Sequence, residues 1–177
     1  MRTIIRIIVI AACLIAMVAL AAVAYVRSTG LRGQPRPGAA ETVVARAIRS
    51  MAIPAELKER KMPANASAES LWNGMQHYAR YCALCHANNG SGEKTPLGSG
   101  LYPKPPDLRA GDTQRLTDGE LFYIIDNGVR FTGMPAFGTG ESTPAGDKQL
   151  WELVQFVRHL PALTADELGE MEGMNAL

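Results

Sequence analysis

Cys82-Ala83-Leu84-Cys85-His86 is the stretch of this 177-residue chain that decides its fold. Two thiols three positions apart lie about one helical turn from each other, and an imidazole follows directly. One turn can thus offer both sulfurs to the two vinyl groups of a haem and bring the imidazole to the iron, which is the C-x-x-C-H attachment pattern. The stretch predicts one haem c, bound covalently through Cys82 and Cys85, with His86 as an iron ligand.

The surrounding sequence disfavours other uses of these cysteines. A redox C-x-x-C of thioredoxin type lies near a βαβ pattern, and no such pattern surrounds this one. A zinc site needs a second pair of ligands, which His77 and His159 do not supply at a suitable spacing. The third cysteine, Cys13, lies in an apolar run, and an odd number of cysteines argues against a disulfide framework.

Helical patterns flank the motif, and no segment reads as a convincing strand. Ser67 to Tyr81 carries apolar residues at helical spacing behind a capping residue. Thr117-Asp118-Gly119-Glu120 is a capping-box pattern that opens a further helix, with Gly128 as its left-handed stop. A last helix is expected from about Asp147 to Leu160. We therefore predict an all-α domain over residues 66–161, with a haem as much of its core.

A sixth iron ligand is sought among the eight methionines. Met134 is the one predicted to lie in a loop after a helix, between Gly133 and Pro135, where the backbone is stiff and open. His/Met ligation is common in haems that carry electrons. His77 and His159 are the alternatives, and each lies on a predicted helix. We predict that Met134 binds the iron opposite His86.

The N-terminal run Ile7 to Val26 contains twenty residues without a charge. As a helix it is about 30 Å long, which is enough to cross the hydrocarbon core of a bilayer. Residues 1–27 are therefore predicted to form a retained membrane anchor. A removable signal peptide, with Ala22-Val23-Ala24 as its cleavage site, is the alternative, although the apolar part of a signal peptide is usually about 7–15 residues long.

The remaining segments are predicted to lie outside the domain. Residues 28–65 read as a linker, in which Glu41 to Met51 has apolar residues at helical spacing. That piece fits either a short interfacial helix or a helix packed on the domain. Residues 162–177 form an acidic tail, which contains Met171. No basic stripe with interleaved aromatic residues is visible, so no nucleic-acid partner is expected.

Taken together, these residues resemble the class I cytochromes c, over roughly Ala66 to Leu160. In that family a glycine and an aromatic residue of the first helix cross the last helix. Gly74 and Tyr78 match this pair, with Trp151 and Phe156 on the opposite helix. The resemblance implies the class I cytochrome c fold, preceded here by a transmembrane helix.

The resemblance also implies roles for two loops. In the family a Pro-x-Leu segment packs on the proximal side of the haem, and the proline carbonyl holds the proximal imidazole; Pro106 and Leu108 match it. Gly133-Met134-Pro135-Ala136-Phe137 matches the distal methionine loop. This loop and the run Leu101 to Pro106 look most like membrane-anchored cytochrome subunits of bacterial oxidases and dehydrogenases.

The expected function is therefore a membrane-tethered monohaem cytochrome c that carries single electrons between respiratory or other redox complexes. Its haem domain is expected on the periplasmic side of a bacterial inner membrane. A filled ligand set leaves no place for a small-molecule substrate, so we expect redox protein partners, such as an oxidase, a dehydrogenase or a quinol-oxidising complex, and no enzymatic activity. A haem peroxidase or sensor needs an open distal side lined by acid–base groups, where this sequence offers Met134. The alternative is a haem subunit of a larger dehydrogenase, oxidase or reaction-centre complex.

Overall fold

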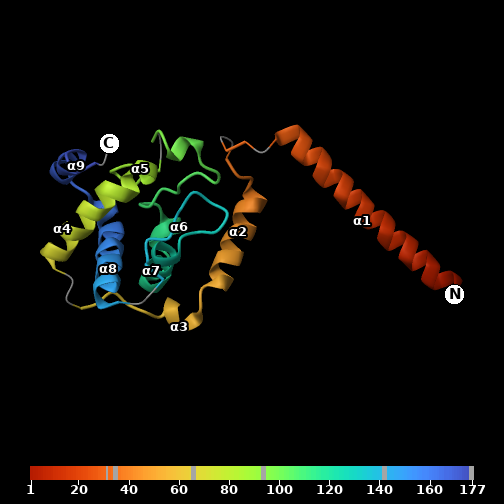
Figure 1. Cartoon of the computed structure of the whole chain (residues 1–177), viewed down its shortest axis with the longest axis horizontal. Coiled ribbons are helices and arrows are strands. Elements are labelled where there is room, and N and C mark those ends of the chain that lie inside the picture. The colour runs from red at the N-terminus through yellow and green to blue at the C-terminus, as the bar shows by residue number, and fades with distance from the viewer. Residues whose placement is uncertain (31, 34–35, 65–66, 93–94, 141–142, 176–177) are drawn as a thin grey trace. The chain divides into compact units, whose positions relative to one another are not determined.

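The computed structural model describes residues 1–30, 32–33, 36–64, 67–92, 95–140 and 143–175 (Figure 1). The chain divides into two compact units, residues 1–33 and residues 34–177. Throughout the described ranges the regular elements are helices and none is a strand. The predicted all-α fold is thus confirmed.

The first unit consists mainly of one helix, α1 (Arg2–Thr29), whose described side chains are exposed. By length and composition α1 is the one helix in the described residues that is long and apolar enough to cross a membrane. A signal sequence near an N-terminus meets the same criterion. The helix ends at Gly30, which has a positive φ of 67°.

The second unit contains the remaining helices and helical turns. They are α2 (Ala39–Ala52), α3 (Ala55–Lys58), α4 (Ala68–His77), the π-helical turn η1 (Tyr78–Cys82), α5 (Ala83–His86), the 3₁₀ turn η2 (Gly98–Gly100), α6 (Gly111–Gln114), α7 (Asp118–Asn127), α8 (Pro144–His159), the 3₁₀ turn η3 (Leu160–Ala162) and α9 (Ala165–Glu172).

The core of the second unit forms where α4 crosses α8 (Figure 1). Gly74 lets the two backbones approach, because a Cβ built there would lie 2.1 Å from the Glu152 carbonyl oxygen. One turn later the rings of Tyr78 and Phe156, both fully buried, have centroids 5.1 Å apart. Trp151 pairs instead with Phe122 of α7, at 4.6 Å. This crossing is the one that the cytochrome c resemblance implies.

The helix α7 starts as its sequence predicts. The Glu120 amide donates to the Thr117 hydroxyl at 3.1 Å, and the Glu120 carboxylate accepts from the Thr117 amide at 2.9 Å, which completes a capping box. Its C-terminal residue Gly128 has φ 66° but ψ −168°, so it does not form the left-handed helical stop that was predicted. The returning chain packs closely against Gly128, where a Cβ would lie 2.6 Å from the Ala136 amide nitrogen, so a side chain does not fit at this position.

The segment predicted as a linker, residues 28–65, lies mostly inside the second unit. Its helix α2 is followed by Ile53, which is buried, and then by α3. The helix α3 contacts α7, where the Thr117 hydroxyl donates to the Lys58 carbonyl at 2.7 Å. Ile53 stands in the short run Met51-Ala52-Ile53-Pro54, where the proline interrupts the helical spacing, so the local sequence does not indicate that Ile53 is buried.

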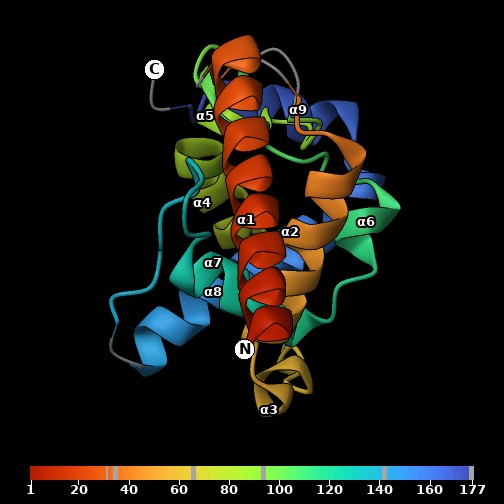
Figure 2. The same cartoon turned by 90° about the vertical axis from the view of Figure 1, so that its right-hand side faces the viewer.

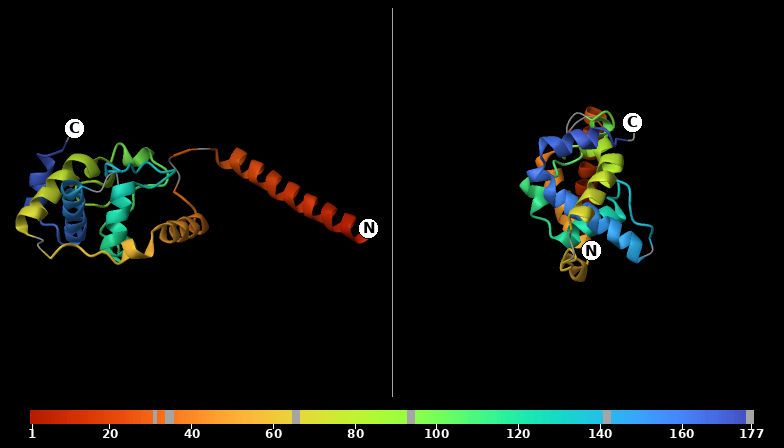
Figure 3. Two further views of the ribbon diagram at one scale, coloured as in Figure 1. Left: turned by 60° about the horizontal axis from the view of Figure 1, so that its bottom comes forward. Right: turned by 90° about the vertical axis from the view of Figure 1, so that its left-hand side faces the viewer.

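The segment predicted as an acidic tail, residues 162–177, also packs on the unit. Thr164 caps α9, and Met171 on that helix is fully buried in the main core. The left side of Figure 3 shows α9 beside α4 at one end of the unit. His159 Nε2 lies 2.8 Å from Glu167 Oε1 and joins α8 to α9. The compact unit therefore extends beyond the predicted boundaries of 66–161 on both sides.

Candidate haem site

The C-x-x-C-H motif lies where the first long helix of the core changes its winding. The predicted helix from Ser67 to Tyr81 is α-helical to His77 and then widens into the π-turn η1, which ends at Cys82. Such wide turns occur often at functional sites. The buried Tyr78 hydroxyl donates to the Ala87 carbonyl just after the motif, at 3.0 Å. This hydrogen bond joins the start of η1 to the residue that follows the motif.

The two motif thiols are free and half-buried. Burial, together with the neighbouring Cys85, raises the pKa of Cys82 to about 12, and burial also raises the pKa of Cys85. Both groups are therefore protonated at neutral pH. In the described residues no three His, Cys, Asp or Glu side chains gather as a metal site.

The His86 ring is oriented by a backbone oxygen. Its Nδ1 lies 3.4 Å from the Pro106 carbonyl, which accepts a hydrogen bond when Nδ1 carries the proton. That tautomer leaves the lone pair of Nε2 for a metal. Burial lowers the pKa of His86, with the Pro106 carbonyl acting in the opposite direction. The ring is thus favoured in the neutral form that binds iron.

The loop that carries Pro106 is held close to the motif. The Thr95 hydroxyl donates to the Cys85 carbonyl at 3.2 Å and accepts from the Gly98 amide at 2.9 Å. The Leu108 amide donates to the Gly90 carbonyl at 2.8 Å. Thr95 is buried, and the sequence contains no motif that singles it out. Thr95 therefore joins the motif at Cys85 to the following loop, although the sequence offers no reason to select it.

Met134 lies in a tight loop after α7. Its carbonyl accepts from the Val129 amide at 3.1 Å, and its amide donates to the Thr132 hydroxyl at 3.1 Å. Gly133 packs against Leu101, since a Cβ there would lie 2.5 Å from that side chain. The loop is therefore fixed both to itself and to the segment before Pro106.

The structure brings His86 into contact with Pro106. Cys82, Leu108 and Met134 are all half-buried, and each packs against the main core cluster. His77 and His159 have other contacts: the His77 ring meets the edge of Tyr81, and His159 binds Glu167. Two thiols on one turn, an imidazole oriented by a carbonyl and a methionine on a fixed loop form a donor set that fits a haem c.

A scan against protein-family models matches residues 69–157 to the family described as cytochrome c oxidase, cbb3-type, subunit III. The match spans just over half of the 177-residue chain and includes the motif, Pro106 and Met134.

The chain belongs to this family.

As a member of it, the protein has a class I c-type cytochrome domain and is a haem protein of electron transfer rather than an enzyme. The resemblance seen in the sequence is confirmed. A search of curated proteins found no match. The matched range leaves out α1, α2, α3 and α9.

Proposed function

We propose that this cytochrome carries one haem c and is tethered to the periplasmic face of a bacterial inner membrane, where it passes single electrons between redox protein complexes. The observation that carries the proposal is the site: Cys82 and Cys85 on one turn, His86 held by the Pro106 carbonyl at 3.4 Å, and Met134 packed on the same core cluster. The family match supports electron transfer.

Each predicted residue has a separate task. Cys82 and Cys85 would hold the haem through thioether bonds, and His86 and Met134 would bind its iron. Leu108 would pack against the ring, next to the carbonyl of Pro106. When bound, a haem c supplies an iron that changes its oxidation state by one electron. The chain would hold the His86 imidazole and the Met134 thioether in place and keep water from the half-buried motif, so that little would have to reorganise when the charge changes.

The proposed tether is α1, retained in the mature protein. Its uncharged run of twenty residues, Ile7 to Val26, exceeds the apolar length of ordinary signal peptides, which is about 7–15 residues. Arg2 and Arg6 precede the apolar run and Arg27, Arg32 and Arg36 follow it, so the charge bias alone does not set the orientation. Because cytochromes c of this family acquire their haem outside the cytoplasmic membrane, the haem domain would lie in the periplasm. N-terminal sequencing of the mature protein tests this, because a chain that begins near Tyr25 would identify a cleaved signal peptide.

Attachment of the haem is tested by mass spectrometry of the denatured protein. The wild type should keep the mass of one haem, and Cys82→Ser with Cys85→Ser should lose it. Cys13→Ser is the matched control, since Cys13 lies in α1 and should leave the haem mass unchanged. A denatured wild type without haem would contradict covalent attachment.

The sixth ligand is tested by absorption in the far red. Ferric wild type should show the weak sulfur-to-iron band, and Met134→Ala should abolish it. Met51→Ala is the control, because Met51 is exposed on α2 and should keep the band. If Met134→Ala leaves the spectrum unchanged, another residue binds the iron.

A second candidate function is that of a haem subunit within a larger dehydrogenase, oxidase or reaction-centre complex. The family description, which names an oxidase subunit, favours it. Mild solubilisation of native membranes followed by size separation distinguishes the two. Co-migration of the cytochrome with a larger oxidoreductase would support the subunit, and migration alone would support the tethered carrier.

A further inference from the structure

The helix α2 exposes a row of large apolar side chains. Val43, Val44, Ile48 and Met51 have exposed fractions of 67%, 57%, 58% and 77%, and no residue of α2 is buried. At about 100° per residue these four positions fall within an arc of about 140°. They therefore form one face, which we call the α2 apolar face.

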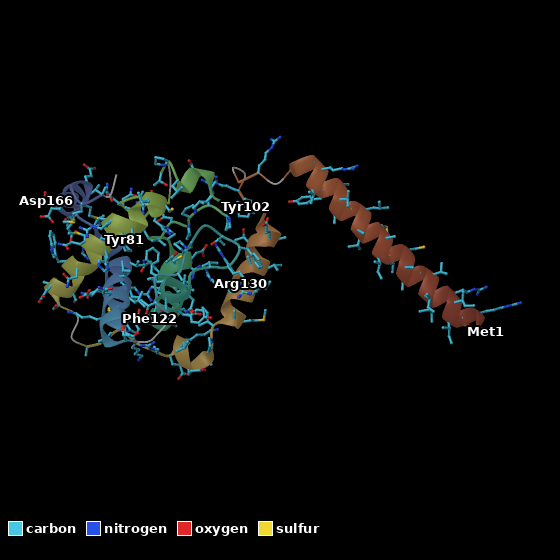
Figure 4. All side chains as sticks on the ribbon, in the orientation of Figure 1. Met1, Tyr81, Tyr102, Phe122, Arg130 and Asp166 are labelled. Atoms are coloured by element: carbon cyan, nitrogen blue, oxygen red, sulfur yellow. The ribbon has the colours of Figure 1, made fainter. Side chains whose placement is uncertain are left out.

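Polar contacts hold α2 within the second unit. Arg46, on the side of the helix away from the apolar face, pairs with Asp112 of α6 at 2.7 Å. Glu41, at the edge of that face next to Ile48, accepts from the Tyr102 hydroxyl at 2.6 Å. Figure 2 shows α2 next to α6, and Figure 4 labels Tyr102 near the start of α2. These contacts set the rotation of the helix about its own axis.

The C-terminal end of α2 is also fixed. Ile53 directly after it is buried, and Lys58 Nζ donates to the Ser50 carbonyl at 2.5 Å. An amphipathic helix on a globular domain normally turns its apolar face to the core. Here the polar side contacts the protein, and the α2 apolar face is directed to the outside.

We propose that the α2 apolar face lies on the surface of an anionic phospholipid membrane, at the depth of the headgroups. This inference rests on the proposed tether. Only the nine residues 30–38 separate α1 from α2, and nine extended residues reach about 30 Å. The start of α2 must therefore lie within that distance of the membrane end of α1. A helix of this type buries its apolar face about 5–10 Å into the boundary of headgroups and acyl chains.

The composition of the region favours lipid over a protein partner. The α2 apolar face consists of valine, isoleucine and methionine, whereas protein–protein contacts depend mainly on tryptophan, tyrosine and arginine. Arg27 lies in the last turn of α1, and Arg32 and Arg36 lie between α1 and α2. Basic residues beside a membrane helix are attracted to anionic headgroups.

The arrangement would give the cytochrome a defined orientation. With its apolar face in lipid and its polar side on Asp112, α2 connects the membrane surface directly to the second unit. The domain would then not swing freely at the end of its linker. Its haem site would be held at a constant angle to the membrane in front of its partners.

The test uses the haem-loaded full chain with Cys13→Ala, reconstituted in vesicles of phosphatidylethanolamine and phosphatidylglycerol. A nitroxide label is attached after Val44→Cys or Ile48→Cys. Ala45→Cys is the matched control, because Ala45 is exposed on the same helix but outside the apolar face. Electron paramagnetic resonance then measures how strongly molecular oxygen, which concentrates in lipid, and a water-soluble nickel chelate relax each label.

Labels at positions 44 and 48 should respond severalfold more to oxygen relative to nickel than the label at position 45. Equal access of nickel to all three positions would overturn the inference. Shielding of positions 44 and 48 from both reagents would also overturn it, in favour of a second copy of the chain on this face. Flotation of the vesicles distinguishes the proposed tether α1 from the proposed lipid contact of α2. If the chain floats with the vesicles but its labels face water, the tether is supported and the lipid contact of α2 is contradicted. If the chain does not float, both proposals are contradicted.

Discussion

The helices α8 and α2 use the same periodicity in opposite ways. In α8 the apolar residues Leu150, Val154 and Val157 are buried against α4 and α7. In α2 the polar side carries Arg46, which pairs with Asp112 of α6, and the half-buried Arg49, whereas the apolar side is exposed. The comparison teaches that a helical period shows which residues share a face, but not what covers that face. The α8 face has a protein partner within the chain, and the α2 face has none among the described residues.

The strongest test of this contrast is the removal of one apolar side chain from each helix. Phe156→Ala should lower the free energy of unfolding by about 3–5 kcal/mol, because it leaves a cavity in the core beside Tyr78. Met51→Ala on α2 should change it by less than about 0.5 kcal/mol. Urea unfolding followed by circular dichroism measures both. Similar losses in the two variants would show that the α2 apolar face is packed against the protein after all.

A smaller effect is expected where α4 and α8 touch. Gly74→Ala places a Cβ about where the Glu152 carbonyl lies and should destabilise the domain by about 1–3 kcal/mol. The matched control is Gly169→Ala on α9, where no atom lies within 4 Å of the new Cβ. That change should be neutral or stabilise by about 0.5–1 kcal/mol. Thermal unfolding distinguishes them, and equal melting temperatures would contradict the close helix crossing.

Helix capping gives the next prediction. Thr117→Ala removes the cap of α7 and the hydrogen bond to Lys58, and should cost about 1 kcal/mol of unfolding free energy. Thr42→Ala on α2 is the control, because the Thr42 hydroxyl donates to the Gly38 carbonyl of its own exposed helix start. It should cost only a few tenths of a kcal/mol. If Thr117→Ala and Thr42→Ala lower the free energy of unfolding in urea by the same amount, the hydrogen bond from Thr117 to Lys58 does not stabilise the contact between α3 and α7.

The smallest expected effect concerns the ion pair that holds α2. Arg46→Gln breaks its contact with Asp112 and should change global stability by less than about 1 kcal/mol, because the pair is half-exposed. It should nevertheless speed hydrogen exchange along α2, since the helix opens locally. Arg115→Gln, which breaks the other pair of Asp112, should leave exchange in α2 unchanged. Equal exchange in both variants would mean that other contacts hold the helix.

Much of the site could be predicted from the sequence because its parts are local. The motif at Cys82 needs one turn of chain, and the cap at Thr117 needs four residues, so both can be recognised without knowledge of the fold. The membrane-spanning length of α1 can also be recognised from its uncharged run alone. Thr95 was missed because its hydroxyl joins segments that only the folded chain brings together.

By itself, the sequence determined which residues are able to form the haem site and where the helices α1, α4, α7 and α8 lie, but it did not indicate α9. The tertiary structure decided how those elements are used. Met171 is in the core because α9 folds back over α8, a side chain does not fit at Gly128 because the Met134 loop passes close by, and the rotation of α2 follows from Asp112. The physical reason is range: thioether attachment and helix caps act over a few residues, whereas burial depends on residues far away in the chain.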